Sequence, residues 1–192
     1  MSYSLRRRSA CWIRLLGLCL ACSLAMSVDA AQPVETIAYN KVQAAYIYKI
    51  ASFVTWPDPL ASPFIICIVG KDEALATVLR QATTSRNIQK LPVDVLNFPL
   101  STLAAARSQL KSCQLVYWLD QPAAGNLDMV RSEGNRDGSV LWISAPEVQT
   151  EGNAMFELEV EDGRIVIYIN RKRLSASKLV VAPPLLSVAR PR

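Results

Sequence analysis

The segment PFIICIVG, residues 63–70, constrains the fold of this chain more than any other stretch. It is a continuous apolar run that is rich in β-branched residues and closed by Gly70. A run of this length is typical of a strand that is buried on both faces of a sheet. We therefore expect residues 63–70 to form a central strand with helices packed on both faces of its sheet.

Strand-like and helix-like segments alternate after this run. Further strands are predicted at residues 91–98, 113–120 and 139–144, and helices at residues 75–84, 100–110 and 126–133. Such alternation is typical of right-handed βαβ units. Asp162-Gly163 then separates two segments of alternating apolar and polar residues, which predicts a hairpin over residues 154–170 with Phe156, Leu158 and Val160 facing inward. The expected fold is α/β, a three-layer sandwich with a mostly parallel central sheet plus a C-terminal antiparallel hairpin.

A long helix is predicted before the first strand, over residues 35–54. Apolar side chains recur there at helical spacing, at Ile37, Val42, Ala45, Tyr46, Ile50 and Phe53, while Thr36, Asn40 and Gln43 are polar. Pro57 cannot continue a helix, so the chain is expected to turn at Trp56-Pro57. We interpret the wide apolar face as packing against the sheet and the other helices. The alternative is an aromatic box that faces a ligand.

The N-terminal segment is typical of an export signal. Four arginines precede or begin an apolar core that runs from Leu15 to Met26, which predicts a secretory signal peptide over residues 1–30. This core is too short for a membrane span. A lipoprotein signal at Cys22 is the alternative. The remaining residues, 31–192, are predicted to form a single exported domain.

Charge is distributed unevenly along the exported part. Cleavage before Ala31 removes four of the 21 basic and one of the 16 acidic side chains, which leaves a net charge of +2. Hence the sequence carries no electrostatic signature of a nucleic-acid-binding protein. Residues 164–192, however, contain seven basic and no acidic side chains. This segment is either a solvated face or a contact surface for an acidic partner or for lipid headgroups.

The residue inventory excludes several kinds of catalytic site. The chain contains no histidine, which rules out His-based triads and removes the commonest transition-metal ligand. Asp72, Glu73, Asp120 and Ser144 follow predicted strands and resemble the Mg²⁺ pocket of a phospho-receiver domain. The competing interpretation is that such acids are helix caps or solvated loop residues, and export separates the chain from ATP. We predict no catalytic, cofactor-binding or metal-binding residue.

Only two cysteines remain after signal cleavage, Cys67 and Cys113. They lie on the first and third predicted strands, which are neighbours in a sheet ordered 2-1-3. Neighbouring strands are close enough for a disulfide, and the exported compartment is oxidising. We predict a Cys67–Cys113 disulfide, with two buried reduced thiols as the alternative. A thiol-dependent enzyme has only this pair in its favour.

Four ordered features together resemble the YfiR-like family of exported regulators. They are KVQAAYIYKIASFVTWPD followed by FIICIVGKDE, a third strand that begins at Cys113, the paired strands AMFELEVEDGRIVIYIN, and the tail SASKLVVAPPLLSVAR. The resemblance implies a periplasmic, non-enzymatic repressor that binds the periplasmic sensor region of an inner-membrane diguanylate cyclase. Such repression lowers cyclic di-GMP signalling and biofilm formation. It also implies that an outer-membrane lipoprotein sequesters the repressor in turn.

The resemblance extends to individual residues only in part. The strand-bridging cysteine pair of the family corresponds to Cys67 and Cys113, whereas the second pair found in some members is missing after Cys113. For partner binding we predict Arg171, Lys172 and Arg173, with Leu179 as an apolar anchor, since charged steering around an apolar centre is a common interface layout. The alternative function is a small-ligand-binding sensor module that feeds a membrane signalling protein. The sequence also leaves a homodimer open.

Overall fold

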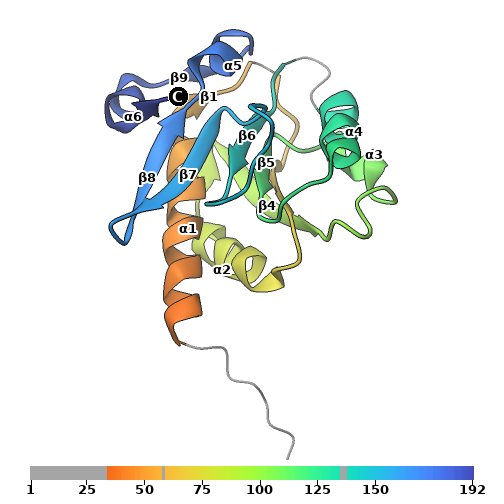
Figure 1. Ribbon diagram of the computed structural model, residues 1–192. Coiled ribbons are helices and arrows are strands. Elements are labelled where there is room, and N and C mark those ends of the chain that lie inside the picture. The colour runs from red at the N-terminus through yellow and green to blue at the C-terminus, as the bar shows by residue number, and fades with distance from the viewer. Residues whose placement is uncertain (1–33, 58, 135–137) are drawn as a thin grey trace, which may run out of the picture. The chain divides into compact units, whose positions relative to one another are not determined.

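The computed structural model describes residues 34–57, 59–134 and 138–192 (Figure 1). The predicted signal peptide over residues 1–30 lies outside the described residues. Within the described part, no helix combines the length and the apolar character that crossing a membrane requires.

The centre of the fold is an eight-stranded sheet in the order β10-β8-β7-β6-β5-β2-β4-β3. Its strands are β2 (Phe64–Val69), β3 (Asn87–Ile88), β4 (Leu91–Phe98), β5 (Leu115–Trp118), β6 (Leu141–Ser144), β7 (Phe156–Glu161), β8 (Arg164–Ile169) and β10 (Arg190–Pro191). The five strands from β4 to β7 in this order are mutually parallel. The predicted central position of β2, between β4 and β5, is confirmed. The hairpin of β7 and β8 extends one side of the sheet, as expected.

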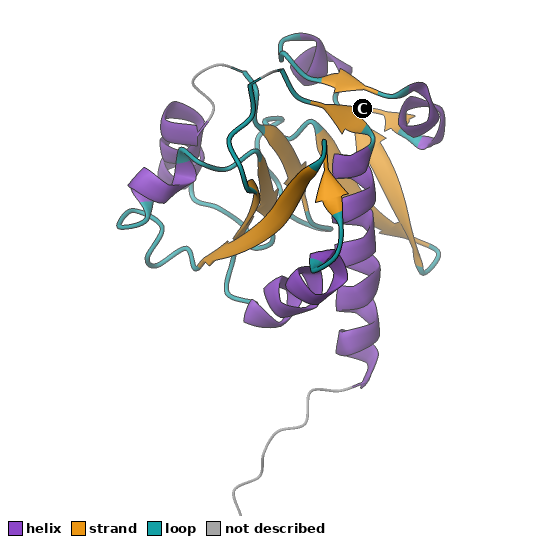
Figure 2. Ribbon diagram, turned by 180° about the vertical axis from the view of Figure 1, so that it is seen from behind, coloured by secondary structure: helices purple, strands orange, loops and turns teal. Residues whose placement is uncertain are grey.

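Helices cover both faces of the sheet, which makes the fold the predicted three-layer α/β sandwich. The helices are α1 (Val34–Ser52), α2 (Glu73–Thr83), α3 (Arg107–Leu110), α4 (Ala124–Gly134), α5 (Arg171–Ser175) and α6 (Pro183–Val188). Figures 1 and 2 show α1 and α2 against one face and α3 and α4 against the other. Two apolar cores result, one on each face. A separate two-stranded antiparallel sheet pairs β1 (Val54–Thr55) with β9 (Val180–Val181).

Three local predictions differ from the structure. Most of residues 100–110 form turns rather than a helix, because the Thr102 hydroxyl donates to the Pro99 carbonyl and competes with helical bonding. Strand β3 was not expected, because its tight turn to β4 uses Gln89 and Lys90 at positive φ rather than the usual glycine. Val160, expected to face inward, is 50% exposed because it pairs with Ile165 next to the last pair of the β7–β8 hairpin, close to its turn.

The helix break after α1 is held by Trp56. This residue is buried, its indole Nε1 donates to the Gln114 carbonyl at 3.2 Å, and its ring meets that of Phe64 edge-on at 4.8 Å. The Gln89 side-chain amide also bonds both the backbone N–H and the backbone carbonyl of Trp56. The C-terminal end of α1 is therefore fixed to the sheet.

Candidate partner-binding surface

Helix α1 buries a different face from the one that the sequence predicts. Asn40 and Gln43 are 4% and 2% exposed, in one stripe with Ala44, Ile47, Ile50 and Ala51. The expected apolar positions Ile37, Val42 and Phe53 are instead 40%, 44% and 37% exposed. Burial of Asn40 is tolerated in this stripe because its side-chain amide donates to Asp72, the N-cap residue of α2, at 3.4 Å. The interpretation that the wide apolar face of this helix is all core packing is therefore wrong for these three residues.

Exposed apolar side chains gather on a few elements. Among the described residues, the eight large ones that are exposed are Ile37, Tyr39, Val42, Phe53, Val160, Val180, Leu186 and Val188. They belong to α1 and its C-terminal end, the hairpin, β9 and α6, which lie on the same side of the molecule in Figure 1, away from α3 and α4. A continuous patch of exposed apolar side chains marks an interaction surface more often than singly scattered ones do, and two of the eight, Phe53 and Val188, line a common groove.

A groove lies within this surface, between α1, β8 and α6. Its lining includes Tyr46, Phe53, Ile167, Leu185 and Val188, and its volume is about 450 Å³. The other lining residues are Ala45, Lys49, Ile50 and Pro184, so that Lys49 is the single charged member. We name this feature the α1–α6 groove.

Backbone bonds hold the two walls of the α1–α6 groove together. The Ala182 N–H donates to the Phe53 carbonyl at 2.8 Å, and Val54 pairs with Val181 in the small sheet. Tyr46 is fixed as well, because its hydroxyl donates to the Ile165 carbonyl of β8 at 3.1 Å. The groove is therefore a preformed feature of the fold, which lowers the entropic cost of binding.

The structure separates the four residues that the sequence proposes for partner binding. Arg171 and Lys172 are exposed on α5, whereas Arg173 turns back to the Gly152 carbonyl at 2.9 Å. Leu179 is 6% exposed and packs in the main apolar core, so its side chain is not available as an anchor on the folded surface. Its neighbour Val180 is 65% exposed, because successive side chains of a strand point to opposite faces.

Part of the C-terminal positive charge is neutralised within the fold. Arg190 pairs with Glu161, and Arg192 pairs with Glu157 at 2.7 Å and also with Glu159. A hydrogen bond from the Tyr168 hydroxyl, together with the bond from Arg190, lowers the pKa of the Glu161 carboxyl below its ordinary value. A charge count along the sequence missed this pairing because the acids lie on β7, before the basic segment begins.

The strand-end acids act on the backbone. Asp72 accepts the Ala74 N–H at 2.8 Å as the N-cap of α2, and Asp120 accepts the Lys71 N–H at 2.8 Å. Across the described ranges, no three side chains of the His, Cys, Asp or Glu type group closely enough to hold a metal ion. These acids therefore have the capping and loop roles that were weighed against a receiver-like pocket.

The predicted disulfide is confirmed. Cys67 of β2 is bonded to Cys113, just before β5, with a Cα–Cα distance of 5.8 Å. Both residues are buried, at 0% and 3% exposure, in the core between the sheet and helices α3 and α4. The bond therefore joins β2 to the segment that leads into β5, its neighbour at the centre of the sheet.

Most of the chain matches the model of one protein family. The family model described as YfiR/HmsC-like matches residues 40–190. The chain belongs to the YfiR/HmsC-like family. The match runs from α1 to β10 and so includes the α1–α6 groove and both cysteines, and it confirms the resemblance drawn from the sequence motifs.

Solved structures add information on the fold alone. A conserved domain protein from Vibrio cholerae O1 biovar El Tor strain N16961 superposes with a TM-score of 0.52 at 13% identity, over 79% of this chain and 59% of the other. This YfiR/HmsC-like chain thus spans about 59% of the length of that neighbour. An apo cysteine desulfurase from Thermococcus onnurineus NA1 reaches a TM-score of 0.38 at 12% identity, over 78% and 46% of the two chains, and carries no argument. No curated protein matches the sequence.

Proposed function

We propose that this protein is a non-enzymatic periplasmic repressor, exported by its signal peptide as one domain over residues 31–192. It binds the periplasmic sensor region of an inner-membrane diguanylate cyclase and thereby lowers cyclic di-GMP synthesis and biofilm formation. Membership in the YfiR/HmsC-like family supports this function. The observation that carries the binding role is the α1–α6 groove together with the exposed side chains Val42 and Phe53 of the same helix region.

The occupant of the groove is a segment of the sensor. An apolar lining of this size accepts two or three side chains of a partner helix or loop, and fully desolvated anchors of that kind supply most of the binding energy at interfaces. Lys49 lines the groove and favours a partner segment in which a carboxylate lies beside the apolar side chains that enter the groove. Arg171 and Lys172 on α5 remain exposed and steer an acidic partner during approach.

Repression requires no bond-making step. A protein that binds one conformation of a sensor more tightly than the other shifts the population towards that conformation. Moving a two-state sensor from about 1% to about 99% repressed needs a preference of about 10⁴-fold between the two states. An outer-membrane lipoprotein that covers the same groove would compete with the sensor and relieve repression.

The first test is made in cells. Deletion of the gene should raise cyclic di-GMP and biofilm mass, and the wild-type gene should restore both. The substitution Val42→Glu should fail to restore them, because it places a charge on the exposed flank of α1. Gln81→Glu on α2 is the control, since it adds the same charge at an exposed position outside the groove. Unchanged cyclic di-GMP in the deletion strain would overturn the function.

The second test is made with purified proteins. The protein should capture the periplasmic part of the cyclase encoded nearest to its gene, and Val42→Glu and Phe53→Asp should weaken capture about tenfold or more, as hot-spot substitutions do. Equal thermal melting of the variants and the wild type would show that folding is intact. Equal capture by all variants would remove the groove from the interface.

A small-ligand sensor module is the second candidate function. It is favoured by the volume of the α1–α6 groove, about 450 Å³, which is typical of sites for small apolar molecules. Such a ligand would raise the melting temperature of the wild type and would compete with the cyclase fragment for the groove. Phe53→Asp should abolish both effects. If no periplasmic metabolite in a broad screen raises the melting temperature, the protein partner remains as the occupant of the α1–α6 groove.

A further inference from the structure

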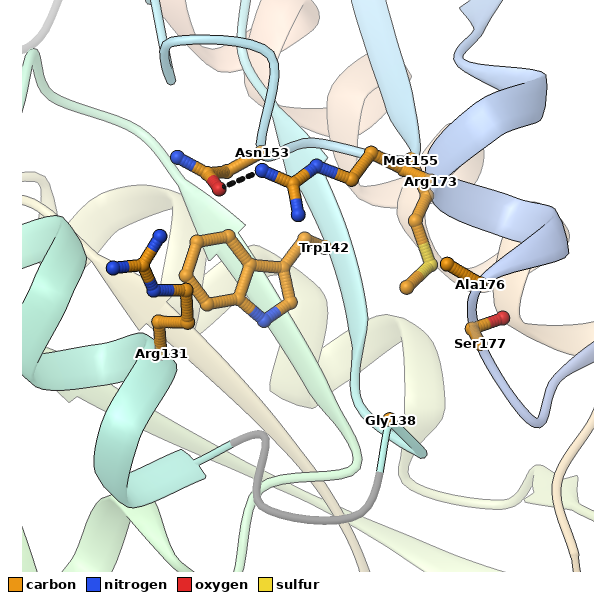
Figure 3. A pocket seen from close by; sticks show the side chains of 8 residues that line it. All are labelled: Arg131, Gly138, Trp142, Asn153, Met155, Arg173, Ala176 and Ser177. Atoms are coloured by element: carbon orange, nitrogen blue, oxygen red, sulfur yellow. Dashed lines mark hydrogen bonds between the residues drawn. The ribbon is translucent and has the colours of Figure 1, made fainter.

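A second cavity lies apart from the α1–α6 groove and shares no lining residue with it. It has a volume of about 70 Å³ and is bounded by α4, β6 and the α5 region (Figure 3). A buried water needs roughly 10–15 Å³ by this measure, so the cavity holds about five water-sized groups. That is the size of one phosphate or carboxylate group with its attached atom.

The charged side chains of the lining are both arginines, Arg131 of α4 and Arg173 of α5. Figure 3 shows their guanidinium groups flanking the indole ring of Trp142. No carboxylate belongs to the lining. Two cations on the wall of one small cavity repel each other, and an anion between them would offset this repulsion.

Arg173 is held in place by its neighbours. Its backbone N–H is accepted by the N-cap side chain of Asn170, its Nε donates to the Gly152 carbonyl at 2.9 Å, and its Nη2 donates to the side chain of Asn153. A guanidinium has five N–H groups, so these side-chain bonds leave three for a further acceptor. These bonds already fix the Arg173 side chain in the free protein, so binding a ligand costs little further side-chain entropy.

Arg131 contributes from the opposite wall. Its Nη2 bonds Asp128 at 2.6 Å on the exposed surface of α4, where both side chains are more than half exposed. An exposed pair of this kind is weak, because solvent screens it. The carboxylate of Asp128 lies outside the cavity lining, so it does not occupy the space between the two guanidinium groups.

A buried donor among the lining residues lacks an acceptor, although it lies on a different side of the indole ring from the two guanidinium groups (Figure 3). Trp142 is 2% exposed, and its indole Nε1 has no hydrogen-bond partner. In Figure 3 this nitrogen is on the edge of the ring nearest Gly138, another lining residue. Buried N–H groups are nearly always paired in folded proteins. The Ser177 hydroxyl does not meet this need, since it donates to the Leu174 carbonyl and accepts the Leu179 N–H.

We propose that this cavity is a binding site for a small oxyanion, a phosphate or carboxylate group of a soluble molecule, held by Arg131 and Arg173 beside Trp142. The reason is chemical complementarity: the site presents surplus donors and positive charge. Guanidinium groups bind phosphate and carboxylate oxygens through charge-assisted pairs of hydrogen bonds. The site is independent of the proposed cyclase partner, whose groove it does not touch.

The test follows the indole N–H signals of the purified protein by ¹H–¹⁵N NMR. Trp142→Phe assigns the Trp142 signal by its loss. Inorganic phosphate and, separately, sodium acetate are titrated, with sodium chloride at equal ionic strength as the control. A saturable shift of the Trp142 signal with phosphate or acetate, and none with chloride, is the expected result. The tighter of the two anions identifies the head group.

Substitutions connect the signal to the arginines. Arg131→Gln, at a largely exposed position, should weaken binding about tenfold or more without affecting folding. Arg173→Lys keeps the charge but loses the paired geometry, and it should weaken binding as well. Lys71→Gln, which removes one positive charge at an exposed position outside the lining, is the matched control and should bind like the wild type. No saturable shift with either anion, or a shift that survives Arg131→Gln unchanged, would overturn the site.

Discussion

Reduction of the Cys67–Cys113 disulfide should lower the stability of this protein by a calculable amount. The bond closes a loop with a sequence separation of 46 residues. In the chain-entropy model, a closed loop of this length restricts the unfolded chain enough to stabilise the folded state by about 4 kcal/mol at 25 °C. The two sulfurs are buried, so reduction leaves the core filled and changes the connectivity of the chain more than its packing.

The assay is urea unfolding of the oxidised and the reduced protein, followed by circular dichroism. With a denaturant slope of about 2 kcal/mol/M, a loss of about 4 kcal/mol moves the midpoint down by about 2 M. The corresponding fall in melting temperature is about 8 to 16 °C for a domain of this size. Titration of free thiols under denaturing conditions confirms the redox state of each sample.

The variant Cys67→Ala/Cys113→Ala separates packing from connectivity. It should be less stable than the reduced wild type, because it also removes two buried sulfur atoms and leaves a cavity. Equal midpoints for the oxidised and the reduced wild type would refute the loop-entropy argument. A double variant as stable as the oxidised protein would refute it as well.

Three further perturbations test the local structure, each by urea unfolding. The hydrogen bond from Tyr168 lowers the pKa of the Glu161 carboxyl in the folded protein. The ionised carboxylate therefore stabilises the fold above the ordinary carboxyl pKa, and this stabilisation is lost as the pH falls through the lowered pKa. Glu161→Gln removes this titration, so the variant should lose less stability in acid than the wild type. Wild type and variant that lose stability equally between pH 7 and pH 3 would contradict this. Asp72→Ala removes the N-cap of α2 and should cost about 1 kcal/mol; an unchanged midpoint would contradict the cap. Gly70→Ala places a Cβ 2.8 Å from the Cβ of Leu119 and should cost about 1 to 3 kcal/mol; a neutral result would show that the two strand ends move apart easily.

The sheet was predictable from the sequence because its strands have strong local signals. The apolar run at residues 63–70 is short, rich in β-branched residues and closed by Gly70, which favours a strand covered on both faces over a buried helix, and Asp162-Gly163 between alternating segments is a strong signal for a tight turn. The connection rules for parallel sheets leave few possible strand orders, and the common 2-1-3 order is the one that the structure has for β4, β2 and β5. Cys67 and Cys113 could be paired for the same reason, since strand order places them side by side.

The exposed face of α1 could not be predicted in this way. A helix with apolar residues on most sides gives no unique direction for its core, and here Asn40 and Gln43 take the buried positions while Val42 is left outside. The two-arginine cavity was missed for another reason. Arg131 and Arg173 are 42 positions apart in the printed sequence, and only the fold brings them to one cavity, although the basic cluster at residues 171–173 had drawn attention to one of them.

The outer edge of β8 has a consequence for how copies of this chain behave in a crowded compartment. On its outer side β8 pairs with β10 only at Tyr168 and Ile169, so among the described residues the stretch from Arg164 to Ile167 is paired with β7 alone and its outer side has no strand partner. The Tyr46 hydroxyl already occupies the Ile165 carbonyl there, and the charged Arg164 stands at the start of the stretch. A neighbouring strand could not add to this edge without displacing that hydroxyl, which protects the sheet from growing across molecules into aggregates.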